Sequence, residues 1–159
     1  RGDRAGAGRL AVQALTLAGR REALKAMIGT RDPDDAAREG LDPVTRIARF
    51  LAAAATGRAD ATAWLDESIE ALGHASDVLP RLLASGFAAL GRHEEALYWL
   101  DQAIDHGFSH LPFLAEHDPL LAPLRGTPAF EHRLERLRAR RAETTAFGGS
   151  VSPPATTAR

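Results

Sequence analysis

The stretch LLASGFAALGRHEEALYWLDQAI, residues 82–104, decides the fold. Apolar and small residues recur at helical spacing on both sides of Gly91, and a short polar sequence follows that glycine. This pattern predicts one helix, a tight glycine turn and a second helix. Ala84 and Ala96 are small enough to let the two helices approach closely. The stretch therefore predicts a helical hairpin.

Related patterns occur twice upstream, which indicates an internal repeat. Gly19, Gly57 and Gly91 are 38 and 34 residues apart, and each is followed by an arginine and then by an alanine. The tripeptide Trp-Leu-Asp occurs at residues 64–66 and again at 99–101. Periods of this length are typical of stacked helical hairpins that bury a continuous core. Strand patterns are weak throughout, so the predicted fold class is all-α, a short α-solenoid of three hairpins with C-terminal capping helices.

The domain organisation follows from these repeats and from the composition of the ends. A disordered start is expected at 1–8 and a disordered tail at 143–159, where small and turn residues dominate. Between the start and the tail, three hairpins are expected within 9–110, at about 9–29, 43–73 and 77–107. A closing segment with a capping helix is expected at 111–142. The individual helices are expected at about 10–18, 20–28, 42–57, 59–72, 77–90 and 93–106.

Three cap-plus-proline pairs mark helix starts. Asp42-Pro43, Asp118-Pro119 and Thr127-Pro128 each place a capping side chain before a proline at the first helical position. The second pair predicts a short helix over 120–124. The third predicts a helix with an apolar stripe and otherwise charged faces, as the terminal helix of a stack requires; the stripe residues are Phe130, Leu134 and Leu137.

Composition limits the classes of function. The chain has 159 residues, a net charge of −1 and no cysteine, which excludes disulfides, thiolate catalysis and cysteine-based zinc sites. The abundance of arginine and alanine indicates a bacterial origin. No apolar run is long enough to span a bilayer, so the expected location is the cytoplasm, with no membrane contact. The only methionine is Met27, so we expect the chain to be a fragment of a longer protein.

No residue cluster predicts catalysis or a cofactor. His106, His110 and His117 lie near carboxylates, but their positions suit a helix terminus and a polar loop better than a metal site. The arginine cluster at 136–141 suits a helix C-terminus, and without interleaved aromatic residues it does not favour nucleic acid. Trp64 and Trp99 are expected in the core. The sequence predicts a protein that is not an enzyme and binds no metal or cofactor.

The third hairpin resembles the tetratricopeptide repeat family. The 34-residue unit of this family has small residues, a large residue, a glycine and two alanines in fixed order. The third hairpin matches this order with Ala84, Phe87, Gly91, Ala96 and Ala103. Phe108 stands where the family prefers proline, and the two upstream copies match less well. The stretch from Gly107 to Arg141 is similar to the segment that closes such arrays in bacterial serine/threonine kinases and transcriptional regulators.

The resemblance implies a binding groove. In the family, the first helix of each hairpin lines a concave surface that contacts a partner. Arginines there would pair with partner carboxylates. The corresponding residues in this chain are Arg9, Gln13, Thr16, Ile47, Leu51, Ala54, Arg81, Ser85 and Ala88.

The resemblance also implies a function. The expectation is a non-catalytic protein–protein interaction scaffold within a larger bacterial signalling or regulatory protein. Its partner would be a protein or peptide bound in the groove, or a second copy bound through an end of the array. The alternative is a module that regulates an attached kinase or transcriptional regulator within the same chain.

Overall fold

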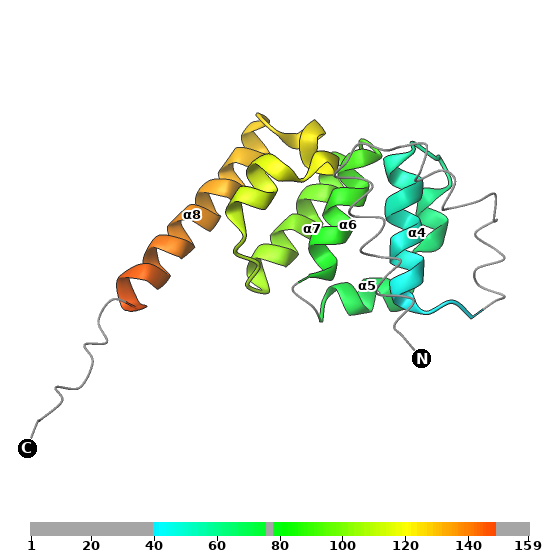
Figure 1. Ribbon diagram of the computed structural model, residues 1–159, viewed down its shortest axis with the longest axis horizontal. Helices are drawn as coiled ribbons and strands as arrows, with labels where there is room; N and C mark the ends of the chain where they lie inside the picture. Colours follow the sequence, from blue (N-terminus) through cyan, green and yellow to red (C-terminus); the bar gives the residue numbers. More distant parts are fainter. Residues whose placement is uncertain (1–39, 76–77, 149–159) are drawn as a thin grey trace, which may run out of the picture.

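Helices form a row in the computed structural model, which describes residues 40–75 and 78–148. Every regular element within these ranges is helical, which confirms the all-α prediction there. The elements are α4 (Pro43–Ala55), η1 (Ala61–Trp64), α5 (Glu67–Gly73), α6 (Leu79–Ala89), α7 (His93–Asp105), η2 (Phe113–His117), η3 (Pro119–Leu124) and α8 (Pro128–Gly148). In Figure 1 the row runs from α4 through α6 and α7 to α8, which extends away from the rest. Residues 1–39, including the predicted first hairpin, lie outside the described ranges.

Glycine turns end the helices at the predicted positions. At Gly91 the backbone φ is +75°, the Gly91 amide donates to the Ala88 carbonyl and the Arg92 amide donates to the Phe87 carbonyl. This pair of bonds is the Schellman arrangement, which satisfies carbonyls at the end of α6. Gly57 and Gly107 end α4 and α7 with the same two bonds. The turn at Gly91 places α7 against α6 along their lengths, so the two form a hairpin.

Replacing Gly91 with alanine tests this turn. No atom lies within 4 Å of a Cβ built there, so any cost comes from the left-handed backbone alone. We expect a loss of about 1–2 kcal/mol in the free energy of unfolding, measured by urea denaturation. Gly91→Asn should lose less, because asparagine tolerates this conformation better. Equal stability of wild type and Gly91→Ala would contradict the turn.

All three predicted helix starts are confirmed, because α4, η3 and α8 begin at Pro43, Pro119 and Pro128. Capping also explains a further helix start that the sequence did not predict. Asp42 accepts a hydrogen bond from the Thr45 amide at 3.1 Å, and Asp118 accepts one from the Leu120 amide at 3.0 Å. The helix expected over 59–72 is instead interrupted at Leu65 and Asp66, whose backbones are extended. Asp66 caps α5 by accepting from the Ile69 amide at 3.1 Å. A capping aspartate therefore divided the expected helix in two.

The pKa of Asp66 makes its cap sensitive to pH. The Ser68 hydroxyl and the Arg46 guanidinium both donate to this carboxylate and lower its pKa from 3.8 to about 2. A lowered folded-state pKa stabilises the fold above pH 4, and this stabilisation is lost as pH falls from about 4 to 2. The shift corresponds to about 2.5 kcal/mol, which the 43% exposure of the side chain reduces to about 1 kcal/mol.

Asp66→Asn is the matching experiment, because asparagine keeps a capping oxygen and has no titratable proton. We expect the variant to be less stable than wild type at pH 6 and most of this difference to be lost at pH 2. Stability can be measured by urea denaturation at both values. A difference that stays constant with pH would contradict the assigned role of the carboxylate.

One apolar core joins the described helices from end to end. Trp64, Phe50, Leu100 and Phe130 are fully buried members of a cluster that extends from α4 to α8. Trp99 is also buried, so both tryptophans are core residues as predicted. The stripe expected on α8 is confirmed, since Phe130, Leu134 and Leu137 are all buried. The structure differs from the prediction in two further places: an unpredicted π-helical turn forms η2, and α8 continues to Gly148 rather than ending near 142.

Candidate functional site

The described residues of the predicted groove are buried. Arg9, Gln13 and Thr16 lie outside the described ranges. The other six side chains belong to the interior, with exposed fractions of at most 8%: Ile47, Leu51, Ala54, Arg81, Ser85 and Ala88. The expectation that they line an open groove is therefore wrong for these six.

The closing segment buries the polar members of this set. Asp118, between η2 and η3, places its Oδ2 atom 2.6 Å from the Ser85 hydroxyl and 3.6 Å from the Arg81 guanidinium. The hydroxyl also lies 3.0 Å from the Arg81 carbonyl oxygen. Arg125 donates to the Asp118 backbone carbonyl at 2.6 Å. The chain's own carboxylate thus occupies the position where a partner carboxylate was predicted.

Two aromatic rings complete the enclosure of Arg81. Its guanidinium carbon lies 5.8 Å from the ring centre of Phe108 and 4.9 Å from that of Phe113. Both distances are within the range of cation–π attraction. Phe108 is the residue that replaces the proline of the family pattern. The Phe108 ring helps to hold the closing segment on α6. The face of α6 that carries Arg81 and Ser85 is therefore part of the core rather than a binding surface.

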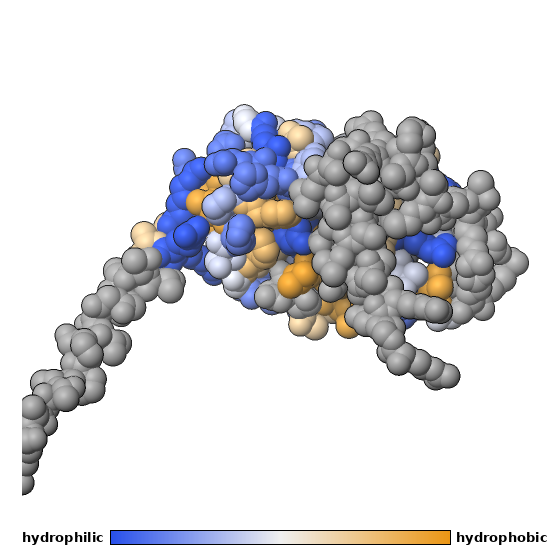
Figure 2. All heavy atoms as spheres, in the orientation of Figure 1, coloured by the Kyte–Doolittle hydropathy of each residue, from blue (hydrophilic) through white to orange (hydrophobic). Residues whose placement is uncertain are grey.

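Ion pairs hold α8 against α7. Asp101 accepts from Arg133 at 2.5 Å and from Arg136 at 2.7 Å, and Asp105 accepts from Arg136 at 3.0 Å. Arg140 pairs with Asp105 at 3.7 Å and donates to the Ile104 carbonyl. Figure 2 shows hydrophilic residues gathered over this end of the molecule. Two of the four arginines in the cluster at 136–141, Arg136 and Arg140, take part in these contacts between α7 and α8.

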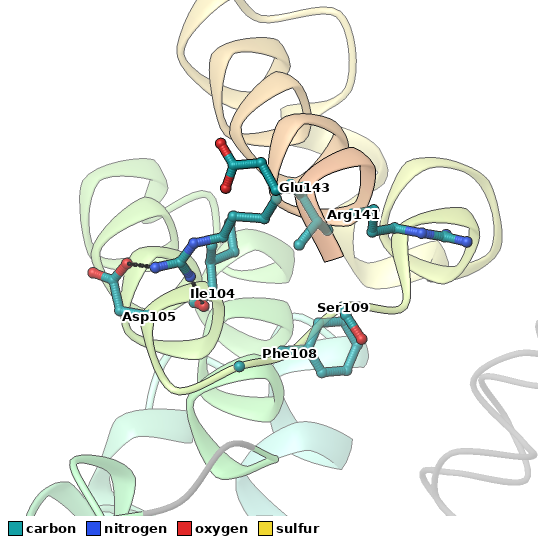
Figure 3. Close-up of a pocket in the computed structure, with 9 residues that line it drawn as sticks. Ile104, Asp105, Phe108, Ser109, Arg141 and Glu143 are labelled. Carbon is teal, nitrogen blue, oxygen red and sulfur yellow. Dashed lines mark hydrogen bonds and ion pairs between the residues drawn. The ribbon is translucent and has the colours of Figure 1, made fainter. Parts of the chain in front are cut away.

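An open pocket of about 680 Å³ is lined in part by Asp105 and Arg140, the last of these ion pairs. Its lining comes from the end of α7, the loop after it and the distal part of α8: Ile104, Asp105, Gly107, Phe108, Ser109, Leu137, Arg140, Arg141 and Glu143. We call it the α7–α8 pocket. Figure 3 shows Phe108 and Ser109 at one end, with Asp105 and Arg141 on opposite sides. The pocket is the strongest candidate for a site because it combines apolar and charged groups in an accessible hollow.

A second pocket is smaller and entirely apolar. It has a volume of about 220 Å³ and is lined by Pro43, Val44, Ile47, Leu72, Ala75, Val78, Leu79 and Leu82. Leu72 and Val78 are among the exposed large hydrophobic residues of the described ranges. The pocket lacks any polar side chain that could orient a ligand.

The chemistry of the α7–α8 pocket suits binding. Its polar groups are two guanidinium groups, two carboxylates and the Ser109 hydroxyl.

Across residues 40–75 and 78–148, no group of three or more histidine and carboxylate side chains is arranged to hold a metal ion. Within the same ranges, no helix has the length and apolarity needed to cross a membrane. The α7–α8 pocket could not be predicted from the sequence, because it depends on how α8 extends away from α7 (Figure 1).

Comparison with known proteins gives no identification. No family model, curated protein or solved structure matches this chain.

Proposed function

We propose that this chain is a non-catalytic protein–protein interaction scaffold of the tetratricopeptide type, built as a short α-solenoid. The α6–α7 hairpin with its Schellman turn supports this reading, as does the single core that runs through the row of helices. The α7–α8 pocket lies at one end of the row, where a partner segment can bind without entering the core.

The observation that carries the proposal is the α7–α8 pocket. Its volume of about 680 Å³ falls within the range of roughly 300–1,000 Å³ that is usual for ligand sites. Ile104 and Leu137 are buried beneath the pocket, Phe108 supplies its partly exposed apolar surface, and charged side chains surround it. An apolar surface within a polar rim is the usual anatomy of a protein-binding hot spot. The working surface is therefore the end of the array rather than the predicted groove.

A selection from a phage-displayed library of random dodecapeptides tests the proposal on the full chain. We expect peptides to be enriched on wild type and to lose about ten-fold in affinity for Ser109→Trp, because the indole would occupy the part of the pocket beside Phe108. Ser109 is exposed, so this variant should keep the wild-type melting temperature. Glu94→Trp, at an exposed position outside the pocket, is the matched control and should bind like wild type. Failure to enrich any peptide, or equal binding to both variants, would contradict the proposal.

A further inference from the structure

Three buried nitrogen donors without an acceptor gather where α4 packs against η1. They are Arg46 Nε and Arg49 Nη1 on α4, and Trp64 Nε1 at the end of η1. Arg46 and Arg49 are three residues apart and therefore share a face of the helix. The guanidinium carbon of Arg49 lies 5.0 Å from the centre of the Trp64 ring, which is fully buried. We call these three residues the α4 donor cluster.

The charge of the α4 donor cluster is only partly compensated within residues 40–75 and 78–148. Arg46 donates to the Asp66 carboxylate at 2.5 Å through Nη1, whereas Arg49 forms no ion pair with any residue of these ranges. Two other carboxylates border α4 and η1, but Asp42 caps α4 and Asp60 is bound by a different arginine. Buried donors lose the hydrogen bonds that water gives them in the unfolded chain, so the cluster calls for an acceptor.

The chain carries acceptors of the right charge directly before α4. Residues 32–39, with the sequence DPDDAARE, lie outside the described ranges and contain four carboxylates. They are Asp32, Asp34, Asp35 and Glu39. We call residues 32–39 the acidic stretch. Its charge is opposite to that of Arg49, and a carboxylate can accept hydrogen bonds from a guanidinium and a second donor at once.

The acidic stretch is long enough to reach the cluster. The described part of the chain begins at Gly40, and α4 begins at Pro43. An α-helix rises about 1.5 Å per residue, which places Arg49 roughly 9 Å along α4 from Pro43. An extended chain spans about 3.3 Å per residue, so a chain that turns back before Asp42 covers this distance by Asp34 or Asp35.

We propose that the acidic stretch folds back along α4 and places a carboxylate of Asp34 or Asp35 on the α4 donor cluster, where it accepts from Arg49 and Trp64. This contact fastens the start of the chain to α4, at the opposite end of the row of helices from α8 (Figure 1). It does not depend on peptide binding at the α7–α8 pocket.

NMR of the indole N–H groups tests this contact in the full chain, which has two tryptophans. Asp34→Ala/Asp35→Ala should move the Trp64 indole proton signal upfield, because the hydrogen bond to a charged acceptor is lost. It should also lower the folding equilibrium constant, measured by urea denaturation, about ten-fold. Asp3→Ala/Glu22→Ala is the matched control. It removes two carboxylates elsewhere in residues 1–39 and should leave the Trp64 signal at its wild-type position.

Arg49→Met shows whether the stabilisation comes from this pair. In the Arg49→Met background, Asp34→Ala/Asp35→Ala should lower the folding equilibrium constant by less than about three-fold. An equal loss in both backgrounds, or an unmoved Trp64 signal, would overturn the proposal. A shift of this signal when sodium acetate, but not sodium chloride, is added to wild type would also overturn it, because the donors would then take their carboxylate from outside the chain.

The wild-type protein supplies a second measurement that needs no variant. The Trp64 indole proton should show nuclear Overhauser effects to the β protons of Asp34 or Asp35, because a carboxylate bonded to Nε1 brings them close to it. Such effects to neither aspartate would contradict the contact even if every variant were too unstable to study.

Discussion

Replacing Asp118 with alanine is expected to lower the free energy of unfolding by about 3–5 kcal/mol, the cost of breaking a buried ion pair from one side. The variant removes the carboxylate beside Arg81, the acceptor of the Ser85 hydroxyl bond and the cap of η3. Both Arg81 and Asp118 are at least nine-tenths buried, so water cannot replace these contacts. Urea denaturation of the full chain measures the change.

The control for this prediction is a double-mutant cycle with Arg81→Met. The double variant Arg81→Met/Asp118→Ala should be more stable than the sum of the two single losses predicts, because no buried charge is left without its counterpart. Asp118→Asn should lose less than Asp118→Ala, since the amide retains the cap and an acceptor for Ser85. Additive losses would contradict a direct interaction between the two side chains.

The second large effect is expected at Gly86, where α6 crosses α4. A Cβ at this position would lie 2.2 Å from Cε1 of Phe50, whose ring is fully buried and packs against Phe87 at 5.4 Å between ring centres. Gly86→Ala should therefore cost about 3 kcal/mol through overpacking. The better helix propensity of alanine offsets about 1 kcal/mol, which leaves a net loss of about 2 kcal/mol.

A smaller side chain at position 50 should relieve this clash. Phe50→Leu alone destabilises the fold by leaving space in the core, but in the Gly86→Ala background it makes room for the added methyl group. We expect the two substitutions to couple favourably by at least about 1 kcal/mol in thermal and urea denaturation. Purely additive losses would show that α4 and α6 do not approach each other as closely as the structure places them.

Local chemistry made much of the fold predictable from the sequence. The Gly91 turn depends on a glycine and its immediate neighbours, and the Asp42 and Asp118 caps each depend on one side chain and an amide two or three residues on. The stripe on α8 follows from helical spacing alone. Periodicity failed at Asp66, because a continuous apolar pattern does not reveal that a capping aspartate has ended one helix and started another.

The site was less predictable because it depends on contacts between distant segments. The repeat pattern put Arg81 and Ser85 on a binding face, but it could not show that Asp118, more than 30 residues later, covers them. The unusual Phe108 was the one indication in the sequence, since an aromatic residue replaced the expected proline. The α7–α8 pocket depends on the angle between two helices, which composition and spacing do not encode.

The most direct test of the central claim, that partners bind at the end of the array, is backbone NMR mapping of a selected dodecapeptide on the full chain. Binding at the α7–α8 pocket should shift the amide signals of residues 104–109 and 137–143, which surround it. No comparable shifts are expected at 47–54 or 81–88, where the buried groove positions lie. Shifts confined to those two buried segments would contradict the claim. They would show that a partner displaces the closing segment from the face of α4 and α6 that it covers.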